Sequence, residues 1–294
     1  MFHNAVFKIL CGHLIRNVTE KGLVGHEKIR LTQELTNDTA TAKIIHGRIP
    51  LAALHIVGAV APVFRQNIGL IVFRLDACGN FRPQFVGQLN RITYPGADAN
   101  ASGTAALLSL AEMLSEYKDG GRTHDSNVIF VAFDAKEMNM AGSRKLWDMI
   151  AGGELKDPVS GKKITKDKIA FMVNIDQIGS SLSPLNDGRK DYMIMLGKHS
   201  LKPAERELLA YCNRSTGLHM DIDYTYYGSQ DFTRIFYRLS DQRVFVDNHI
   251  PAVVFTSGIT MNTNKTWDTP ENMDMEVFKK RISLIYHWID MMMQ

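Results

Sequence analysis

The sequence predicts an α/β fold, a three-layer α/β/α sandwich around a mostly parallel, mixed central sheet. Two observations lead to this prediction. Four short apolar runs have the composition of strands that are buried on both faces. Helical segments alternate with them and close the chain. Such alternation is typical of parallel strands whose crossover helices cover the two faces of a sheet.

The expected elements run from residue 101 to the C-terminus. Apolar residues recur at helical spacing in the first helix, Ala101–Tyr117, where Ser102 is placed to cap the start. The expected strands, in chain order, are Asn127–Asp134, Ile169–Asp176, Asp191–Gly197 and Ile250–Gly258. Two further helices are expected over Lys202–Ser215 and Met275–Met293.

Size and composition are those of an ordinary soluble globular protein. The 294 residues are 45% hydrophobic and 22% charged, which supplies a core that needs no disulfides. The net charge of +3 gives no reason to expect a nucleic-acid partner. The longest apolar runs, such as Leu51–Phe64, are too short for a membrane span, and the three cysteines have no metal-binding spacing.

The character of the chain changes near residue 93. Residues 1–93 hold 11 Lys and Arg against 5 Asp and Glu, whereas residues 94–294 carry a net charge of −3. The first part has apolar runs, including Asn67–Ala77, without a clear helical period. It fits a half-buried β region, or a stretch that is not the native partner of residues 94–294 because of a misassigned start or a shifted reading frame. We therefore divide the chain into residues 1–93 and 94–294.

Acidic residues gather where the expected strands end. Asp134 and Glu137 follow one strand and Asp176 ends the next, while Asp241 and Asp268 lie on loops around the last strand. Ligands of open α/β sheets bind beyond the carboxyl ends of the strands. This edge of the sheet is therefore the expected functional site.

Five ordered blocks of the sequence resemble the M28 family of zinc aminopeptidases. They are PGADANASGTAALLSLAEML, FVAFDAKEMNMAGS, VNIDQIGS, IPAVVFTSG and KTWDTPENMD, and the match runs from about Tyr94 to the C-terminus. The resemblance implies the three-layer sandwich and, in active members, two zinc ions bridged by a carboxylate and a water. The ions activate that water and stabilise the oxyanion, and a carboxylate accepts the proton of the water.

The family's site residues carry over only in part. The second Glu of the family's Glu-Glu pair matches Glu137 and the strand-ending Asp matches Asp176, so two metal ligands are retained. The bridging Asp falls at Ala99, next to Asp98, which is a further residual candidate. The general base falls at Lys136, where an ammonium cannot accept a proton from water.

The two imidazoles of the family's site are also missing. The late His falls at Asn264, and the block with the first His aligns near Phe85–Arg91, where Gln88 or Leu89 takes its place. Two Zn²⁺ ions bring four positive charges, whereas Glu137 and Asp176 supply two negative ones. We therefore expect that zinc, the family's cofactor, is absent or weakly bound here, with a single weakly held cation as the alternative.

These residues favour a peptidase-like protein that has lost the zinc-dependent reaction and serves as a binding or interaction domain for a peptide or protein. The first alternative is an active metallo-aminopeptidase with an altered, mononuclear site, and the second is an unrelated α/β protein. The family suggests a periplasmic or extracellular location, although this N-terminus does not show one.

Overall fold

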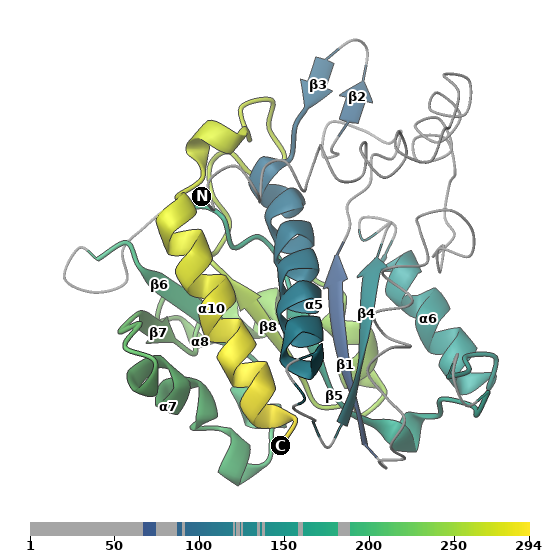
Figure 1. Cartoon of the computed structure of the whole chain (residues 1–294). Coiled ribbons are helices and arrows are strands. Elements are labelled where there is room, and N and C mark those ends of the chain that lie inside the picture. Colours follow the sequence, from purple (N-terminus) through teal and green to yellow (C-terminus); the bar gives the residue numbers. More distant parts are fainter. Residues whose placement is uncertain are drawn as a thin grey trace.

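The computed structural model describes residues 67–74, 87–89, 92–119, 121, 124, 126–133, 136, 139–157, 161–181 and 189–294. A six-stranded sheet forms the middle layer in the order β4-β1-β5-β8-β6-β7 (Figure 1). Its strands are β1 (Asn67–Arg74), β4 (Ser126–Phe133), β5 (Ile169–Ile175), β6 (Tyr192–Leu196), β7 (Asp221–Asp223) and β8 (Ala252–Thr256). Neighbouring strands are parallel except for the antiparallel pair β6 and β8. The sheet is therefore mixed and mostly parallel, as predicted.

Helices cover both faces of this sheet. One face carries α5 (Gly103–Asp119), α7 (Leu208–Ser215) and α10 (Met275–Met292), and α5 and α10 lie side by side in Figure 1. The other face carries α6 (Ala141–Ala151) and α9 (Gln242–Asp247). Each face has its own hydrophobic core, so the predicted three-layer sandwich is confirmed.

Shorter elements complete the described part of the chain. A helix α8 (Gln230–Phe236) packs Phe236 against Tyr226 near β6. Two short strands, β2 (Gly87–Leu89) and β3 (Ile92–Tyr94), pair in a separate antiparallel sheet, at the top of Figure 1. The remaining turns are a π-type turn at Ala97–Ser102 and 3₁₀ turns at Lys166–Lys168, Lys198–Ser200, Pro203–Glu205 and Pro270–Asn272.

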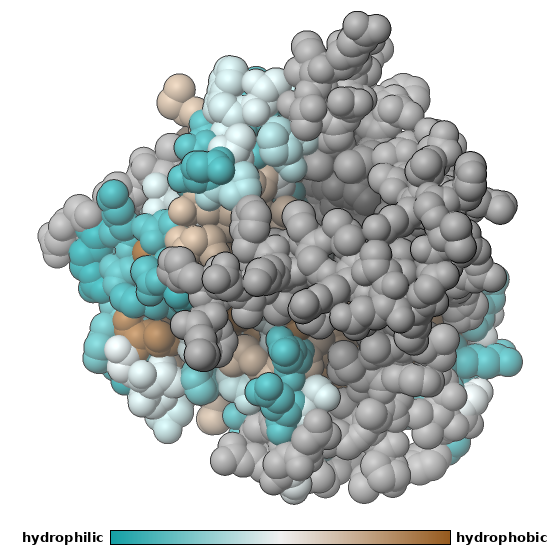
Figure 2. All heavy atoms as spheres, turned by 45° about the horizontal axis from the view of Figure 1, so that its top comes forward, coloured by the Kyte–Doolittle hydropathy of each residue, from teal (hydrophilic) through white to brown (hydrophobic). Residues whose placement is uncertain are grey.

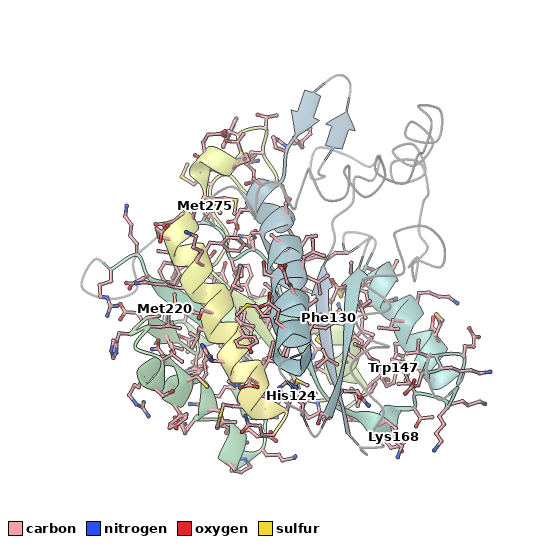
Figure 3. All side chains as sticks on the ribbon, in the orientation of Figure 1. His124, Phe130, Trp147, Lys168, Met220 and Met275 are labelled. Atoms are coloured by element: carbon pink, nitrogen blue, oxygen red, sulfur yellow. The ribbon has the colours of Figure 1, made fainter. Side chains whose placement is uncertain are left out.

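The larger core is built around the C-terminal helix. The indole of Trp288 is fully buried and meets Phe171 and Phe255 edge-on, at centroid distances of 5.9 and 5.3 Å. Near the end of the same helix, Asp290 Oδ1 lies 2.8 Å from His124 Nε2 (Figure 3). The periodic apolar pattern of α10 is thus explained by burial of one face against α5 and the sheet.

Two predictions about local structure are wrong. The segment Asn127–Asp134 is predicted to be buried on both faces, but β4 is at the edge of the sheet and most of its side chains are half-buried. Ser102 Oγ accepts from Ile178 N at 3.1 Å, and its role as the cap of α5 stays a prediction. The α-helix expected over Lys202–Ser215 begins only at Leu208, after a turn that starts at Pro203.

Strand β1 comes from the part of the chain that differs in charge from the rest. It pairs in parallel with β4 from Asn67 to Arg74 on one side and with β5 from Ile68 to Ile71 on the other. Residues Asn67–Arg74 of the apolar run Asn67–Ala77 thus form a strand, in agreement with the interpretation as a β region, while Leu51–Phe64 lies outside the described residues. The division at residue 93 stays a prediction, because neither the reading frame nor the independence of the two parts is tested.

In the part of the chain that the structure describes, no helix is both long and apolar enough to cross a membrane. Figure 2 shows one face of the molecule, with the top of Figure 1 turned forward. Hydrophilic residues dominate the described surface on this face, and hydrophobic residues form small patches among them.

Candidate functional site

The segment Ile175–Gly179, directly after β5, joins the parts of the candidate site. Its backbone is fixed to the neighbouring strand, since Asp176 N donates to Phe255 O at 3.1 Å and Ser257 N donates to Gln177 O at 2.9 Å. This is the carboxyl end of a central strand, where a parallel sheet places its ligands.

The turn Ala97–Ser102 packs against this segment through Asn100. Asn100 Nδ2 donates to Ile175 O at 3.1 Å, and Asn100 Oδ1 accepts from Gln177 N at 2.7 Å. The same oxygen accepts from Gly103 N at 3.3 Å, so Asn100 also satisfies the first amide of α5. A side chain at residue 103 would not fit, because a Cβ there would lie 2.5 Å from the Asn100 amide.

Asp98 is a buried part of the same scaffold. Its side chain is 2% exposed, and its Oδ1 accepts from Gly179 N at 2.7 Å and from Ser102 Oγ at 3.0 Å. Burial raises the pKa of the Asp98 carboxyl, although the hydrogen bond from Gly179 opposes this effect. The structure therefore directs Oδ1 of this residual candidate ligand toward the backbone that follows β5.

Ala99 is held in place as firmly as its neighbours. Its side chain is 2% exposed, and its N–H donates to Asp268 Oδ2 at 3.0 Å, while Asp98 N donates to Asp268 Oδ1 at 3.0 Å. Asp268 is itself buried, which raises its pKa. The turn that would present a bridging carboxylate is thus fully formed and carries a methyl group at that position.

Lys136 and Asp176 form an ion pair. Lys136 Nζ lies 2.9 Å from Asp176 Oδ2, and the two side chains are 18% and 14% exposed. The same carboxylate oxygen accepts from Ser240 Oγ at 2.8 Å. Lys136, which the resemblance assigns to the general-base position, thus supplies a positive charge to Asp176, which it assigns to a metal-ligand position.

The loop after β8 closes the site from the other side. Gln177 Nε2 donates to Gly258 O, and Tyr227 and Tyr192 hydroxyls both donate to Ser257 O, at 3.0 and 2.7 Å. The hydroxyl of Tyr226 accepts from Ile259 N at 2.7 Å. These tyrosines therefore hold the loop in place beside the site.

Asn264, which the resemblance assigns to the position of the late His, lies on the same loop. Its side chain is half-buried and its φ is 60°, a left-handed conformation that Asn tolerates better than most residues. Neighbouring Thr263 Oγ1 lies 3.3 Å from Gln177 Nε2, which places this part of the loop beside the segment after β5.

Arg281 supports the site from behind. It is fully buried on α10 and donates to three carbonyl oxygens, those of Tyr192 at 2.8 Å and of Ile178 and Ser180 at 2.7 Å. Burial lowers the pKa of its guanidinium, and the nearby carboxylate of Asp98 opposes that effect. Arg281 thus fixes the far end of the segment that also carries Asp176.

The remaining predicted positions are only partly described. Glu137 lies outside the described residues, so its role as a ligand stays a prediction. Gln88 lies in β2, in the separate two-stranded sheet. The strand that ends beside β4 and β5 is β1, at Arg74, well before the segment that the resemblance aligns with the first imidazole block.

The described side chains at these positions do not fit a pair of bridged zinc ions. Such a centre needs several anionic or imidazole ligands around each ion. Among the described residues, no three His, Cys, Asp or Glu side chains are grouped closely enough to hold a metal ion. Asp176 Oδ2 already accepts two hydrogen bonds, and the side chain of Ala99 has no atom that could coordinate a metal ion. The Lys136 ammonium lies beside Asp176, where a metal ion would need negative charge.

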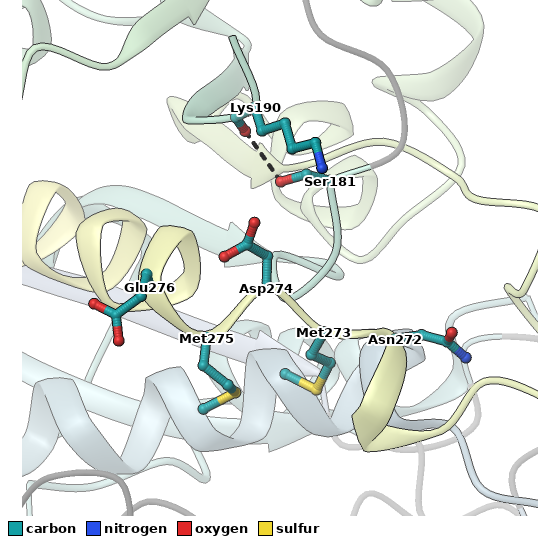
Figure 4. Close-up of a pocket in the computed structure, with 7 residues that line it drawn as sticks. All are labelled: Ser181, Lys190, Asn272, Met273, Asp274, Met275 and Glu276. Atoms are coloured by element: carbon teal, nitrogen blue, oxygen red, sulfur yellow. Dashed lines mark hydrogen bonds between the residues drawn. The ribbon is translucent and has the colours of Figure 1, made fainter.

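An open polar pocket lies elsewhere, at the start of α10 (Figure 4). It is lined by Ser181, Lys190, Asp274 and Glu276, among others. Ser181 Oγ donates to Lys190 O at 3.0 Å across it. Neither Asp176 nor Ala99 lines this pocket, so it is separate from the candidate site.

Sequence reasoning missed three residues that organise the site. Ser240 and Asn174 connect Asp176 to the loop before α9, and Arg281 braces the segment Ile178–Ser180. Asn174 gave a signal, because a polar residue inside the apolar run Ile169–Asp176 requires hydrogen-bond partners. Arg281 gave a similar one, as a charge within the apolar pattern of the last helix.

Comparisons with known proteins agree with this arrangement. The model of peptidase family M28 matches residues 75–289. Nicalin of Caenorhabditis elegans is 33% identical over 91 residues, which are 29% of this chain and 16% of nicalin. The chain therefore spans a small part of that relative.

Solved structures show the same fold at low identity. BSAP, a zinc aminopeptidase from Bacillus subtilis, has a TM-score of 0.54 at 15% identity, over 78% of this chain and 47% of its own. LapA aminopeptidase of Legionella pneumophila has a TM-score of 0.54 at 15% identity, over 78% of this chain and 51% of LapA. Nicastrin, a γ-secretase component, has a TM-score of 0.56 at 17% identity, over 77% of this chain and 40% of nicastrin. Taken with the family match over most of the chain, this fold establishes that the protein belongs to peptidase family M28.

Proposed function

We propose that this chain is a non-catalytic member of family M28 that binds a peptide or protein. The observation that carries the proposal is Ala99. Its turn is held by hydrogen bonds to Asp268 and through Asn100, yet the position that the resemblance assigns to the bridging carboxylate holds a methyl group. The scaffold of a catalytic site is present without the group that would join two metal ions.

Lys136 supports the same conclusion. A general base must accept a proton from the attacking water, and an ammonium has no lone pair to do so. Its proton-bearing nitrogen is instead engaged with Asp176 at 2.9 Å. Nicastrin, described as a component of γ-secretase, has a similar fold, which favours assembly with other proteins as a use of this scaffold.

A binding surface is available beside the site. Ile259, Met261 and Trp267 are 48%, 82% and 55% exposed on the loop that runs from β8 to Asp268. This loop reaches the candidate site, because Asp268 accepts from the amides of Asp98 and Ala99. Exposed apolar side chains beside an inactive site favour peptide or protein as the ligand.

Hydrolysis of an aminoacyl anilide tests the loss of activity. The full chain with added zinc should turn over no faster than the Asp176→Asn variant, because neither can assemble the metal-bound nucleophile. Zinc-dependent turnover that a chelator abolishes, and that Asp176→Asn lowers, would contradict the proposal and favour the altered metallopeptidase instead.

Binding is tested separately with a panel of immobilised unmodified peptides. We expect retention of some sequences by the wild type and weaker retention by Trp267→Ser. Equal retention by both proteins would remove this loop from the proposal. A periplasmic or extracellular location is proposed on family resemblance alone, and protease accessibility in intact cells tests it.

A further inference from the structure

The ion pair between Lys136 and Asp176 belongs to a buried polar network. Asp176 Oδ2 accepts from Lys136 Nζ at 2.9 Å and from Ser240 Oγ at 2.8 Å. Ser240 Oγ accepts in turn from Asn174 Nδ2 at 2.9 Å. The single hydroxyl hydrogen of Ser240 is committed to Asp176, so the direction of this chain of hydrogen bonds is fixed.

The network continues into the segment before α9. Asn174 Nδ2 also donates to Gln242 Oε1 at 2.8 Å, and Gln242 Nε2 donates to Tyr237 O at 2.6 Å. Asn174 and Gln242 are fully buried, and Ser240 is 4% exposed. These bonds connect the end of β5 and Asp176 to the loop and helix that pack beside it.

We propose that the Lys136 ammonium has taken over the structural role of a metal ion, acting as a fixed internal cation that holds Asp176 and closes this network without zinc. This role rests on the proposed non-catalytic function. A carboxylate that is mostly removed from water stays ionised more readily beside a positive partner. Lys136 supplies it at hydrogen-bonding distance, and by its charge it also opposes binding of a divalent cation at Asp176.

Substitutions on the two sides of the ion pair should reveal this role in the stability of the protein. Removing one partner of a shielded ion pair leaves the other charge uncompensated, which costs much more than removing both. Lys136→Met should therefore destabilise the protein, and adding Asp176→Asn to it should restore most of the loss, since Asn can still accept from Ser240. Lys136→Glu should be the most damaging change, because it sets two carboxylates side by side.

Thermal unfolding of the full chain, with chelator or with zinc chloride, measures these effects. The wild type should unfold at the same temperature, within about 1 °C, under both conditions. We expect Lys136→Met to lower the midpoint by about 4–8 °C and the double variant to recover at least half of that loss. Added zinc should raise the midpoint of Lys136→Glu, since that variant exchanges the internal cation for a carboxylate that can bind metal.

Lys145→Met is the matched control. Lys145 is exposed on α6, and its replacement should leave the midpoint unchanged within about 1 °C. If Lys136→Met does not fold, Asp176→Asn alone is read in the same way, because it leaves the ammonium without its carboxylate. If Lys136→Met or Asp176→Asn is as stable as the wild type, the inference is overturned. A wild type that zinc stabilises and a chelator destabilises would also overturn it.

The outcome is separable from the proposed function. If Lys136→Met and Asp176→Asn unfold at the wild-type midpoint and the protein hydrolyses no anilide, the role of Lys136 is overturned and the non-catalytic function stands. Zinc-dependent hydrolysis would overturn the function itself, whatever the midpoints of the variants.

Discussion

The two sides of the segment Ile175–Gly179 differ in what their polar side chains contact. On the side of the turn Ala97–Ser102, Asn100 and Asp268 bond mainly to backbone amides and carbonyls. On the other side, Lys136, Asp176 and Ser240 bond to one another. A substitution cannot remove the backbone groups, so losing the side chain that bonds to them leaves buried polar groups without partners and costs stability. The side chains around Asp176 can be replaced with less cost, provided that the new side chains form hydrogen bonds or ion pairs with one another.

The largest effect that would sharpen this comparison is expected at Asn100. Asn100→Ala removes one donor and one acceptor and leaves Ile175 O and the amide of Gln177 buried without partners. We expect a loss of about 3 kcal/mol or more in the free energy of unfolding, measured by urea denaturation. Ser109→Ala on α5 is the control, with little expected change. A similarly small effect at Asn100 would contradict the scaffold role of the turn.

Arg281 should come next, because its partners are also backbone groups. Arg281→Met keeps the apolar stem but leaves the carbonyls of Ile178, Ser180 and Tyr192 without this donor. The expected loss is about 2–3 kcal/mol in the same denaturation measurement. Lys279→Met, at a half-buried position of the same helix where the side chain pairs with exposed Glu276, should cost much less. Equal losses in the two variants would show that Arg281 does not brace the site.

Asp98 provides a test through pH. Burial raises its pKa in the folded state above the unfolded value, so its contribution to stability is present below the unfolded pKa and lost as pH rises through the folded pKa. Asp98→Asn does not titrate. The stability of the variant relative to the wild type should therefore increase as pH rises from about 4 to 7. A difference that is independent of pH would mean that burial does not raise this pKa.

The smallest effect on folding is expected at the exposed loop. Trp267→Ser should change the free energy of unfolding by less than about 1 kcal/mol, because its side chain is 55% exposed. The same variant is the one expected to weaken peptide retention, so stability and binding separate at this residue. A large loss of stability would assign Trp267 to the fold and leave the binding surface without support.

The fold could be predicted from residue 101 onward because the pattern there is local. The apolar runs of β5, β6 and β8 and the amphipathic face of α10 each indicate their own structure. The edge position of β4 depends on the order of strands in the sheet, which no single run encodes. Strand β1 was harder to identify, because it lies in the positively charged residues 1–93, where the apolar runs have no clear period.

The candidate site was predicted in its positions but not in its contacts. The five blocks assign site positions to Ala99, Lys136, Asp176 and Asn264, and these assignments stay predictions. In the structure Lys136 pairs with Asp176, and the turn with Ala99 and the loop with Asn264 both contact the segment around the end of β5 through neighbouring residues. The partnership of Lys136 with Asp176 and Ser240 could not be predicted, because it joins residues 40 and 64 positions apart through tertiary packing. The resemblance indicates which ligand positions have changed, and only the fold shows which contacts the residues at those positions make.

The most direct test of the proposed loss of the metal site is diffraction at the zinc absorption edge from crystals of the full chain grown with zinc. We expect no pair of anomalous peaks beside Asp176, and Lys136 Nζ within hydrogen-bonding distance of that carboxylate. Two zinc peaks joined by a bridging oxygen next to Asp176, with Lys136 displaced from it, would contradict the loss of the metal site and the role of Lys136 together.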